Sequence, residues 1–359
     1  MPIKIFAAKS LSGNPFDGVD NSTISVFGRI DKQKIIFFTD ALADFSDKGA
    51  INHFSLGGGG ILRTIKKLSV LRKKSPDLLW GIANNLELLF LIFKPKKTKY
   101  VINLHTVLAK KSDYWKVRTP WFFRKFLFSR ADKIICVSEF IAQNPKKYFP
   151  WKNIDVVLNG VDADFFNPEK RNRDYLNKKF KIGIDKPIVS FVGILHPRKR
   201  PDFFIDLARS FSGANFVSVG RRVDGFDFLN NTGNMDNFYQ VEKMSREDIA
   251  ILLASSDVFA FPSLNEPSAA VIGEAMASGA AVITSDSGGN GEFIENGKDG
   301  FLVPVDSGEK DAYLKNLKEI INNGGLKYEI SKNARTAAIN RFSFDKTAKL
   351  YENSIMEIL

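Results

Sequence analysis

The stretch that decides the fold reads Ser263-Leu-Asn-Glu-Pro-Ser-Ala-Ala-Val-Ile-Gly-Glu-Ala-Met-Ala-Ser-Gly-Ala-Ala-Val-Ile-Thr-Ser-Asp-Ser-Gly-Gly289. The apolar run Val258–Phe261 precedes it and predicts a buried strand that leads into a polar loop. A helix over Ser268–Ser278 follows and ends at Gly279, which can adopt the left-handed conformation of a helix C-terminus. The next strand, Ala281–Thr284, completes a unit that is typical of a parallel sheet.

The same alternation of short strands and amphipathic helices extends outward through most of the 359 residues, a length that exceeds one ordinary hydrophobic core. The polar stretch Asn167–Lys181 interrupts it. We therefore predict an α/β protein with two Rossmann-like domains, residues 1–168 and 169–340, and a C-terminal helix within 341–359 that packs back on the first domain. The predicted strands are Ile3–Ala7, Lys34–Thr39, Leu78–Gly81, Tyr100–Leu104, Lys133–Val137, Asp155–Leu158, Ile188–Gly193, Asn215–Val219, Val258–Phe261, Ala281–Thr284 and Gly300–Val303.

The start of the 268–278 helix has the features of a ligand site. Three small residues there, Ser268, Ala269 and Ala270, let a ligand approach the free backbone N–H groups, which favour a phosphate. Glu266 lies at the mouth of the loop and Glu274 about two turns into the helix. Two separated carboxylates suit a ligand with two sets of hydroxyls, such as a sugar and a ribose. Ligands of open α/β sheets bind beyond the carboxyl ends of strands, which is this position.

Glu266 and Glu274, with seven residues between them, resemble the E-x7-E signature of retaining glycosyltransferases of family four, which have the GT-B fold of two domains facing across a cleft. Four further segments resemble family motifs in order along the chain. They are Asn103-Leu-His-Thr106, Ala131-Asp-Lys-Ile-Ile-Cys-Val-Ser138 with Leu158-Asn-Gly-Val-Asp162, Phe191-Val-Gly-Ile-Leu-His-Pro-Arg-Lys199, and Gly300-Phe-Leu-Val-Pro304.

The resemblance implies a role for each matching residue. Lys199 and Arg198, which follow Gly193, would neutralise the diphosphate of a nucleotide-sugar donor. Glu274 would hold the ribose hydroxyls and Glu266 the hydroxyls of the transferred sugar. His105 would contact the sugar near its reacting carbon, so His105, Glu266 and Lys199 are the expected catalytic residues.

Three departures from the family pattern bear on activity. Ile194 stands where the family often has Arg, which puts the stabilisation of the leaving group in doubt unless Arg198 substitutes. Ala269 replaces a common Gly and is narrower in its allowed backbone angles. Ser12-Gly-Asn-Pro-Phe-Asp-Gly18 replaces a usual Gly-Gly loop, and which Gly there meets the donor stays open. Gly57–Gly60 is interpreted as a turn, while Gly288–Gly289 either approaches the donor or forms a turn.

The resemblance therefore predicts transfer of a sugar from a UDP- or GDP-sugar to a hydroxyl of a glycan or lipid-linked glycan, with retention of configuration, in surface polysaccharide or lipopolysaccharide synthesis. Two alternatives stay open: a nucleotide-sugar epimerase or hydrolase on the same fold, and, ranked lower, a nucleic-acid-binding protein. No cofactor and no metal are expected, because two side-chain cations can neutralise the diphosphate and the three histidines are widely spaced. Asp162–Asp164 is interpreted as turn chemistry.

The positive charge of the chain lies in its first half. Residues 1–168 hold 27 Lys/Arg and 14 Asp/Glu, hence +13, whereas the remaining residues hold 25 and 26, hence −1. Trp115–Arg130 interleaves aromatic and basic residues, and in Ile61–Leu71 the basic Arg63, Lys66 and Lys67 lie opposite an apolar face containing Ile65. These segments predict peripheral contact with an anionic membrane. Without a signal peptide or a membrane-spanning run, and with the single Cys136 in an apolar run, we expect a cytoplasmic protein at the inner face of the membrane.

Overall fold

The computed structural model describes residues 1–8, 18–40, 51–54, 60–83, 87–106, 121–223 and 235–359. Three predicted features lie wholly or partly outside these residues: the loop Ser12–Gly18, the glycines of Gly57–Gly60, and the first part of Trp115–Arg130. The chain divides into two compact units. Unit 1 comprises Met1–Gly160 and Phe344–Leu359, and unit 2 comprises Val161–Ser343.

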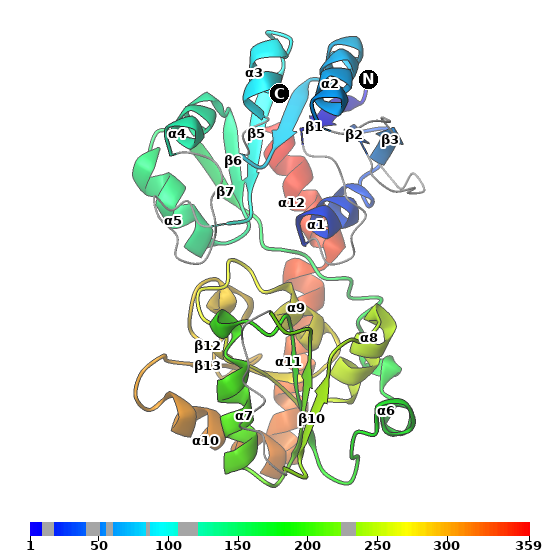
Figure 1. Cartoon of the computed structure of the whole chain (residues 1–359), viewed down its shortest axis with the longest axis vertical. Coiled ribbons are helices and arrows are strands. Elements are labelled where there is room, and N and C mark those ends of the chain that lie inside the picture. Colours follow the sequence, from blue (N-terminus) through cyan, green and yellow to red (C-terminus); the bar gives the residue numbers. More distant parts are fainter. Residues whose placement is uncertain (9–17, 41–50, 55–59, 84–86, 107–120, 224–234) are drawn as a thin grey trace. The chain divides into compact units, whose positions relative to one another are not determined.

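Unit 1 is built on a parallel sheet of seven strands in the order β3-β2-β1-β4-β5-β6-β7 (Figure 1). The order reverses direction at β1, as in doubly wound folds. The strands are β1 (Ile3–Ala7), β2 (Ile35–Asp40), β3 (Ile51–Phe54), β4 (Leu78–Gly81), β5 (Lys99–Leu104), β6 (Lys133–Cys136) and β7 (Asn153–Val156). The helices are α1 (Gly18–Phe27), α2 (Gly60–Lys74), α3 (Glu87–Phe93), α4 (Trp121–Arg130), α5 (Glu139–Tyr148) and α12 (Phe344–Met356).

Helices cover both faces of this sheet, and successive strand residues point alternately to one face and to the other. Phe6, Leu79 and Ile134 pack with residues of α2, α3, α4 and α5 on one face. Ile5, Leu78 and Ile135 pack with residues of α1 and α12 on the other. The strands therefore read as continuous apolar runs, which made most of them predictable from the sequence.

The helix α12 is anchored to unit 1 by polar contacts along its length. Its Tyr351 hydroxyl donates a hydrogen bond to Asn103 Oδ1 (3.2 Å), and its Glu352 pairs with Lys34 Nζ (2.8 Å). The Tyr351 ring packs against Trp80 at 5.7 Å between centroids. Residues far apart in the sequence thus complete one unit.

Lys67 of α2 corrects the predicted polar face of that helix. Its side chain is buried, and its ammonium donates a hydrogen bond to the Ala8 carbonyl oxygen (2.7 Å), whereas Ile65, expected on the apolar face, is exposed. The carboxylates of Asp40 and Glu87 lie near enough to act on the ammonium, although burial still lowers the pKa of Lys67 to about 8. Helical periodicity predicts Lys67 on the solvent side, because periodicity takes no account of a hydrogen-bond acceptor such as the Ala8 carbonyl oxygen inside the protein.

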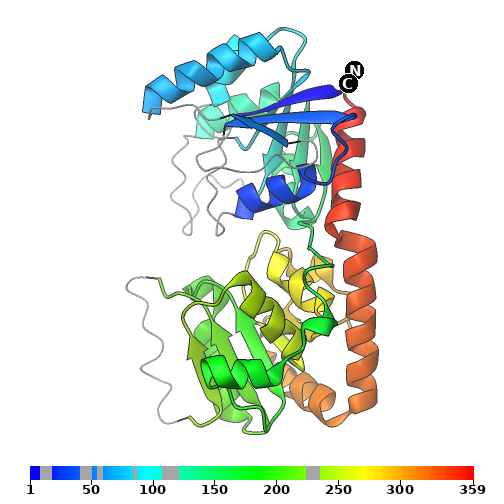
Figure 2. The same ribbon diagram turned by 90° about the vertical axis from the view of Figure 1, so that its right-hand side faces the viewer.

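Unit 2 contains a parallel sheet of six strands in the order β10-β9-β8-β11-β12-β13. The strands are β8 (Ile188–Val192), β9 (Asn215–Val219), β10 (Phe238–Val241), β11 (Val258–Phe261), β12 (Ala281–Ser285) and β13 (Phe301–Val303). The helices are α6 (Arg173–Phe180), α7 (Pro201–Ser210), α8 (Arg246–Ser255), α9 (Ala270–Ala277), α10 (Glu309–Asn322) and α11 (Gly324–Phe342), with short 3-10 turns at η1 (Pro168–Lys170), η2 (Pro197–Lys199) and η4 (Asn290–Phe293). The helices α9 and α11 pack on each other and on β12 (Figure 2).

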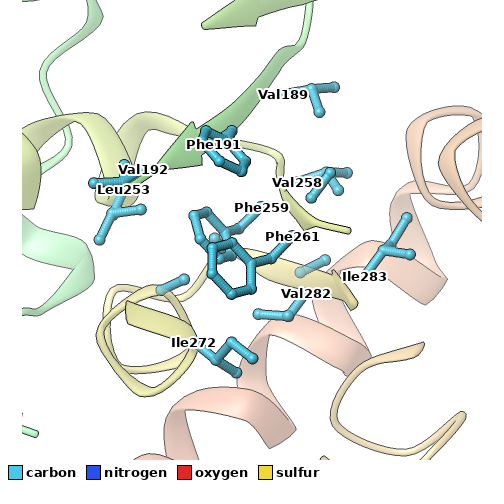
Figure 3. Close-up of a cluster of buried hydrophobic side chains, with 14 of the residues drawn as sticks. Val189, Phe191, Val192, Leu253, Val258, Phe259, Phe261, Ile272, Val282 and Ile283 are labelled. Atoms are coloured by element: carbon cyan, nitrogen blue, oxygen red, sulfur yellow. The ribbon is translucent and has the colours of Figure 1, made fainter. Parts of the chain in front are cut away.

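The core of unit 2 is rich in aromatic side chains from the central strands (Figure 3). Phe191 of β8 and Phe261 of β11 stack at 5.7 Å between ring centroids, and Phe259 follows at 5.7 Å from Phe261. Every residue of β8, β9, β11 and β12 is buried. The predicted α/β class with two Rossmann-like units is confirmed.

The division between the units falls at Gly160, ahead of the predicted boundary at residue 168. Val161 and Phe166 are the reason, because both are buried in the core of unit 2. The Val161 N–H also donates to the Phe342 carbonyl oxygen (2.9 Å). The helix within residues 341–359 begins at Phe344 and belongs to unit 1.

Candidate functional site

The candidate site of unit 2 lies where the strand order reverses. The first strand of this sheet, β8, has β9 on one side and β11 on the other, so the connections that follow β8 and β11 leave the sheet on opposite faces. Ligands of open α/β sheets bind in the crevice beyond the carboxyl ends of such neighbouring strands. The segment Gly193–Lys199 follows β8, and the segment Pro262–Ala269 follows β11.

Three of the predicted residues meet at this point. Lys199 Nζ lies 3.3 Å from Glu266 Oε1, and Arg198 Nη1 lies 3.5 Å from Glu266 Oε2. The Glu266 side chain is only 8% exposed, and the Ser263 hydroxyl donates to its Oε1 (3.0 Å). Neither cation therefore belongs to a solvated surface run: one carboxylate, two cations and a hydroxyl form a polar group at the edge of the sheet.

The two loops that carry these residues are joined through their backbones. The Leu264 N–H donates to the Arg198 carbonyl oxygen (2.9 Å), so the loop after β11 is fixed to the loop after β8. His196 caps η2, because its Nδ1 accepts a hydrogen bond from the Arg198 N–H (3.2 Å). Gly193 leaves room for the lysine, since a Cβ built there would lie 3.1 Å from Lys199 Nζ.

Arg200 ends the η2 turn and pairs with Glu309. Its backbone is left-handed (φ +52°), and its guanidinium Nη1 lies 2.8 Å from both carboxylate oxygens of Glu309. The Ser285 hydroxyl at the end of β12 donates to the same carboxylate (2.7 Å). The Glu309 side chain is 5% exposed and the Arg200 side chain 20%, so the carboxylate of this ion pair is nearly buried.

Gly288 and Gly289 support the backbone of Glu266. The Gly289 N–H donates to the Glu266 carbonyl oxygen (2.7 Å). Gly288 has φ +65°, and a Cβ there would lie 2.5 Å from the same oxygen. Asn290, fully buried, donates through Nδ2 to the Ser263 carbonyl oxygen (3.1 Å). The two glycines thus permit a close backbone approach that positions Glu266.

Glu274 lies in α9, in surroundings different from those of Glu266. Burial of its carboxyl raises the pKa of Glu274 to about 7, even though part of the side chain stays exposed, and Arg246 and Asp162 are the charged groups that act on it. Arg246 Nη2 lies 3.3 Å from Asp162 Oδ2, and its guanidinium stacks 3.9 Å from the Phe165 ring centroid. Among the described residues Glu274 forms no ion pair with Lys199 or Arg198.

The start of α9 carries small residues and has no side-chain cap. Ala269 has φ −82° and ψ 85°. The Ala270 N–H donates only to the carbonyl oxygen of Ser268, two residues earlier (3.1 Å). Backbone donors of a first helical turn are therefore close to Glu266, at the carboxyl end of β11.

His105 lies in unit 1, immediately after β5. Its Nε2 accepts a hydrogen bond from Asn103 Nδ2 (2.9 Å), and Asn103 in turn accepts one from the Tyr351 hydroxyl of α12. The imidazole is therefore oriented by a chain of two buried polar groups.

Sequence reasoning missed the polar residues that hold the predicted ones in place. Arg246, Ser263 and the Arg200–Glu309 pair carried no motif that would single them out. Asp162 had been interpreted as turn chemistry, and it does accept a hydrogen bond from the Phe165 N–H (3.3 Å), but it also meets Arg246. In the part of the chain that the structure describes, no three His, Cys, Asp or Glu side chains are grouped as metal ligands. No described helix combines the length and apolarity that a membrane span requires.

Two family models match the chain. Residues 172–337 match "Glycosyl transferases group 1", and residues 49–165 match "Glycosyltransferase Family 4". Among curated relatives, spore coat protein SA of Bacillus subtilis is 30% identical over 237 residues, which is 60% of this chain and 63% of the relative. The UDP-Gal:alpha-D-GlcNAc-diphosphoundecaprenol alpha-1,3-galactosyltransferase of Escherichia coli is 30% identical over 245 residues, 65% and 61% of the two chains. The chain thus spans about three fifths of the length of these two relatives.

Solved structures of similar fold cover nearly the whole chain. A glycosyltransferase from Rickettsia africae has a TM-score of 0.79 at 19% identity and covers 99% of this chain and 98% of its own. Anabaena HepE in complex with UDP and glucose has a TM-score of 0.76 at 19% identity and covers 99% and 100%. At this identity the likeness is one of fold. The two parts of the chain are therefore similar to glycosyltransferase family 4 and to group 1 glycosyl transferases, respectively, and the chain has the GT-B fold.

Proposed function

We propose that this protein is a glycosyltransferase that moves a hexose from a UDP- or GDP-sugar to a hydroxyl of a glycan or lipid-linked glycan, with retention of configuration, in the synthesis of a surface polysaccharide or lipopolysaccharide. The observation that carries the proposal is the meeting of Lys199, Arg198 and Glu266 where the strand order of unit 2 reverses. Cations, a carboxylate and the backbone N–H groups of a helix start are what a nucleotide sugar needs at such an edge.

Each residue has a role in this proposal. Lys199 and Arg198 bind the donor diphosphate. Gly193 has no side chain, which leaves space for the Lys199 side chain beside the backbone. As the glycosidic bond breaks, negative charge develops on the leaving phosphate, and these cations stabilise it without moving. The backbone donors at Ser268, Ala269 and Ala270 add partial positive charge on the same side. No metal and no cofactor takes part in this scheme.

The two carboxylates bind hydroxyl groups at different distances from the diphosphate. Glu266, held by Ser263 and by the Gly289 N–H, accepts hydrogen bonds from the transferred sugar. Glu274 accepts them from the ribose. His105 of unit 1 contacts the sugar near its reacting carbon, and its ring is already oriented by Asn103.

The names of the relatives support this class of donor and acceptor. The Escherichia coli relative is named for UDP-Gal and for a diphosphoundecaprenol-linked acceptor. A relative of Mycobacterium tuberculosis, 32% identical over 193 residues, is named a GDP-mannose-dependent alpha-mannosyltransferase. We extend to this chain the common chemistry, a nucleoside diphosphate hexose and a hydroxyl acceptor.

Peripheral contact of unit 1 with an anionic membrane belongs to the same proposal. Unit 1 holds 29 Lys/Arg and 15 Asp/Glu, hence +14, whereas unit 2 holds 23 and 25, hence −2. Large apolar side chains are exposed beside basic residues on its helices, where they can enter a lipid headgroup region. They are Ile65, Ile92, Phe93, Phe122 and Phe126, and Trp151 is exposed in the turn that follows α5. Such contact would place the protein at the inner face of the membrane, where lipid-linked acceptors lie.

Thermal stabilisation by donors tests the proposal. The purified protein is titrated with UDP, GDP, ADP and their common sugars, beside Glu274→Ala and the exposed control Glu295→Ala. A donor present at 100 times its dissociation constant adds about 2.7 kcal/mol to the free energy of unfolding. We expect one nucleotide family to stabilise the wild type and Glu295→Ala, and to stabilise Glu274→Ala much less. If no donor stabilises the folded wild type, the donor site proposed here is wrong.

A further inference from the structure

Arg124 occupies a position in unit 1 that the sequence pattern reserves for an apolar residue. The buried face of α4 consists of residues 124, 127, 128 and 131, the spacing of a helix stripe that faces a core. Leu127, Phe128 and Ala131 fill three of these positions, and Arg124, only 5% exposed, fills the first. A long charged side chain thus points into the protein from the first part of the helix.

The guanidinium of Arg124 has no counter-charge in the described structure. Its Nε and Nη1 atoms are both buried, and neither has a hydrogen-bond partner among the residues that the structure describes. Burial alone lowers the pKa of Arg124, and no carboxylate acts on it in return. Buried guanidinium groups are normally paired, because an unpaired charge loses its hydration with nothing in exchange. A site that holds one is thus suited to an anion that arrives from outside.

The topology brings this guanidinium to the functional edge of unit 1. The helix α4 connects β5 to β6, which are parallel neighbours with Leu104 opposite Cys136. A helix that joins parallel neighbours runs back along the sheet, so its first turns lie at the carboxyl ends of the strands. His105 follows β5 at that same edge. The first turn of α4 holds no acidic residue, and its backbone N–H groups add partial positive charge there.

We propose that Arg124 binds a phosphate group carried by the acceptor, at the edge of the unit 1 sheet where His105 follows β5. The inference rests on the proposed function, since it names the class of acceptor. A phosphate offers two oxygens to the planar guanidinium, and burial strengthens the contact because little water competes for it. The positive charge of unit 1 steers such an anion toward the site.

Thermal stability gives the first test, because a ligand-binding role and a structural role of Arg124 predict opposite changes in melting temperature when the arginine is replaced. Arg124→Met removes an unpaired buried charge and keeps most of the side-chain volume, so we expect the melting temperature of the ligand-free protein to rise by about 2–4 °C. The matched control is Lys125→Met, which removes the same charge from the exposed neighbour on the same helix and should leave the melting temperature unchanged. A fall on Arg124→Met would show that the arginine serves the fold, and the inference would be overturned.

Binding of phosphate probes to the full-length protein gives the second test. The probes are inorganic phosphate and dodecyl phosphate, with dodecyl maltoside as the uncharged comparison, and binding is followed by calorimetry and by the Arg Nε–H resonances in NMR spectra. We expect Arg124→Met to bind dodecyl phosphate about 10- to 100-fold more weakly than the wild type and Lys125→Met do, the loss expected for a charge-assisted contact. An equal loss for inorganic phosphate would assign the phosphate group itself, and a loss for dodecyl phosphate alone would assign a lipid-borne phosphate.

Equal binding by wild type and Arg124→Met would overturn the inference. Donor stabilisation measured on the same samples keeps this result distinct from failure of the proposed function. If Arg124→Met binds donors normally while no phosphate probe depends on Arg124, the donor site stands and only the acceptor assignment falls.

Discussion

Glu266 shows how one residue can serve two purposes at a binding edge. Its carboxylate lies within 3.5 Å of two cations, and its backbone oxygen accepts the Gly289 N–H. A donor diphosphate can replace the carboxylate beside the two cations, while the backbone hydrogen bond to Gly289 keeps the loop in place. The residue therefore keeps Lys199 and Arg198 close together before any ligand is present.

Replacing Gly288 tests whether the backbone at Glu266 matters. Gly288→Ala forces a Cβ to within 2.5 Å of the Glu266 carbonyl oxygen in a left-handed conformation. Gly297→Ala is the matched control, because φ is +77° there and no atom lies within 4 Å of the new Cβ. We expect the control to lower the free energy of unfolding by about 1–2 kcal/mol with donor binding intact. Gly288→Ala should cost more and abolish donor stabilisation. Normal donor binding by Gly288→Ala would contradict the role given to this loop.

The raised pKa of Glu274 predicts that donor binding depends on pH. Its pKa is raised to about 7 in the free protein, so the carboxylate that we propose accepts ribose hydroxyls is present mainly above pH 7. We expect the affinity for an intact nucleotide sugar to increase between pH 5.5 and 8, and Glu274→Gln to bind weakly with little dependence on pH. The free protein should show the opposite trend. Because the folded pKa lies above the unfolded value, stability is lost as pH rises from about 4.5 to about 7.

The measurement for Glu274 is calorimetric titration at four or more pH values, with thermal unfolding of the ligand-free protein at the same values. Glu274→Gln should be more stable than the wild type at pH 8 and closer to it at pH 5, because the amide cannot become charged. A wild type whose affinity does not change over this range would contradict the assignment of Glu274 to the ribose.

Much of the candidate site could be predicted at this scale, for a physical reason. Lys199, Arg198 and Glu266 lie in loops that follow strands, and the carboxyl ends of neighbouring parallel strands bring such loops together. Their partners could not be predicted. Arg246 meets Asp162 across 84 residues of sequence, a distance over which no spacing rule applies.

At the scale of elements, the end of the 3-10 turn η2 is held by the salt bridge between Arg200 and Glu309. Arg200 adopts a left-handed conformation that costs a non-glycine residue about 1–2 kcal/mol, and its guanidinium pairs with the nearly buried Glu309. The pair links the end of η2 to α10 and, through Ser285, to β12. The ion pair between Arg200 and Glu309 thus offsets the unfavourable backbone conformation of Arg200 and fixes the loop.

Arg200→Ala separates these two effects when it is compared with Arg200→Gly. Both variants leave the Glu309 carboxylate nearly buried without its cation, and we expect a loss of about 3 kcal/mol in the free energy of unfolding for Ala. Gly should recover about 1 kcal/mol of that loss, because it relieves the left-handed strain. Urea unfolding followed by far-UV circular dichroism measures both. Arg209→Ala breaks the exposed pair with Asp206 and should have almost no effect. Equal stabilities of the Ala and Gly variants would contradict the strain argument.

Elements were predictable where apolar runs were long and failed where they were short or polar. Every predicted strand has a counterpart in the structure, with ends that differ by at most two residues. The edge strands β3 and β10 were missed. Residues of β10 (Phe238–Val241) are all half-buried, and among the described strands only β9 lies beside it. β10 lacks the continuous burial that makes a central parallel strand recognisable, although the edge strands β7 and β13 were predicted.

At the scale of the whole molecule, unit 1 is discontinuous in sequence and unit 2 is continuous. The sheet of unit 1 is covered on one face by α12, whose Tyr351 and Ile355 are buried against it. The C-terminal helix was predicted from its period, but its partners could not be, because a partner such as Asn103 lies 248 residues earlier than Tyr351. Unit 2 draws its whole core from Val161–Ser343.

Separate fragments should therefore behave differently. We expect residues 161–343 to fold alone, with a cooperative thermal transition and with donor binding that Lys199→Ala abolishes. Residues 1–160 should fold only when a peptide of residues 344–359 is added, because without it Trp80 loses its contact with Tyr351. All four tryptophans of the chain belong to unit 1, so tryptophan fluorescence reports on that unit alone. A native-like fluorescence spectrum for residues 1–160 without the peptide would contradict this expectation.

The late position of α12 has a consequence for synthesis on the ribosome. The polypeptide emerges from its N-terminus, so the strands β1 to β7 leave the ribosome before α12, which covers one of their faces together with α1, has been made. Unit 2 has all of its residues available while that face is still uncovered. The first half of the newborn chain must therefore wait, with an apolar sheet surface exposed, until translation reaches residue 355. During this interval the chain presents a binding surface for chaperones, and the second unit is the first to become complete.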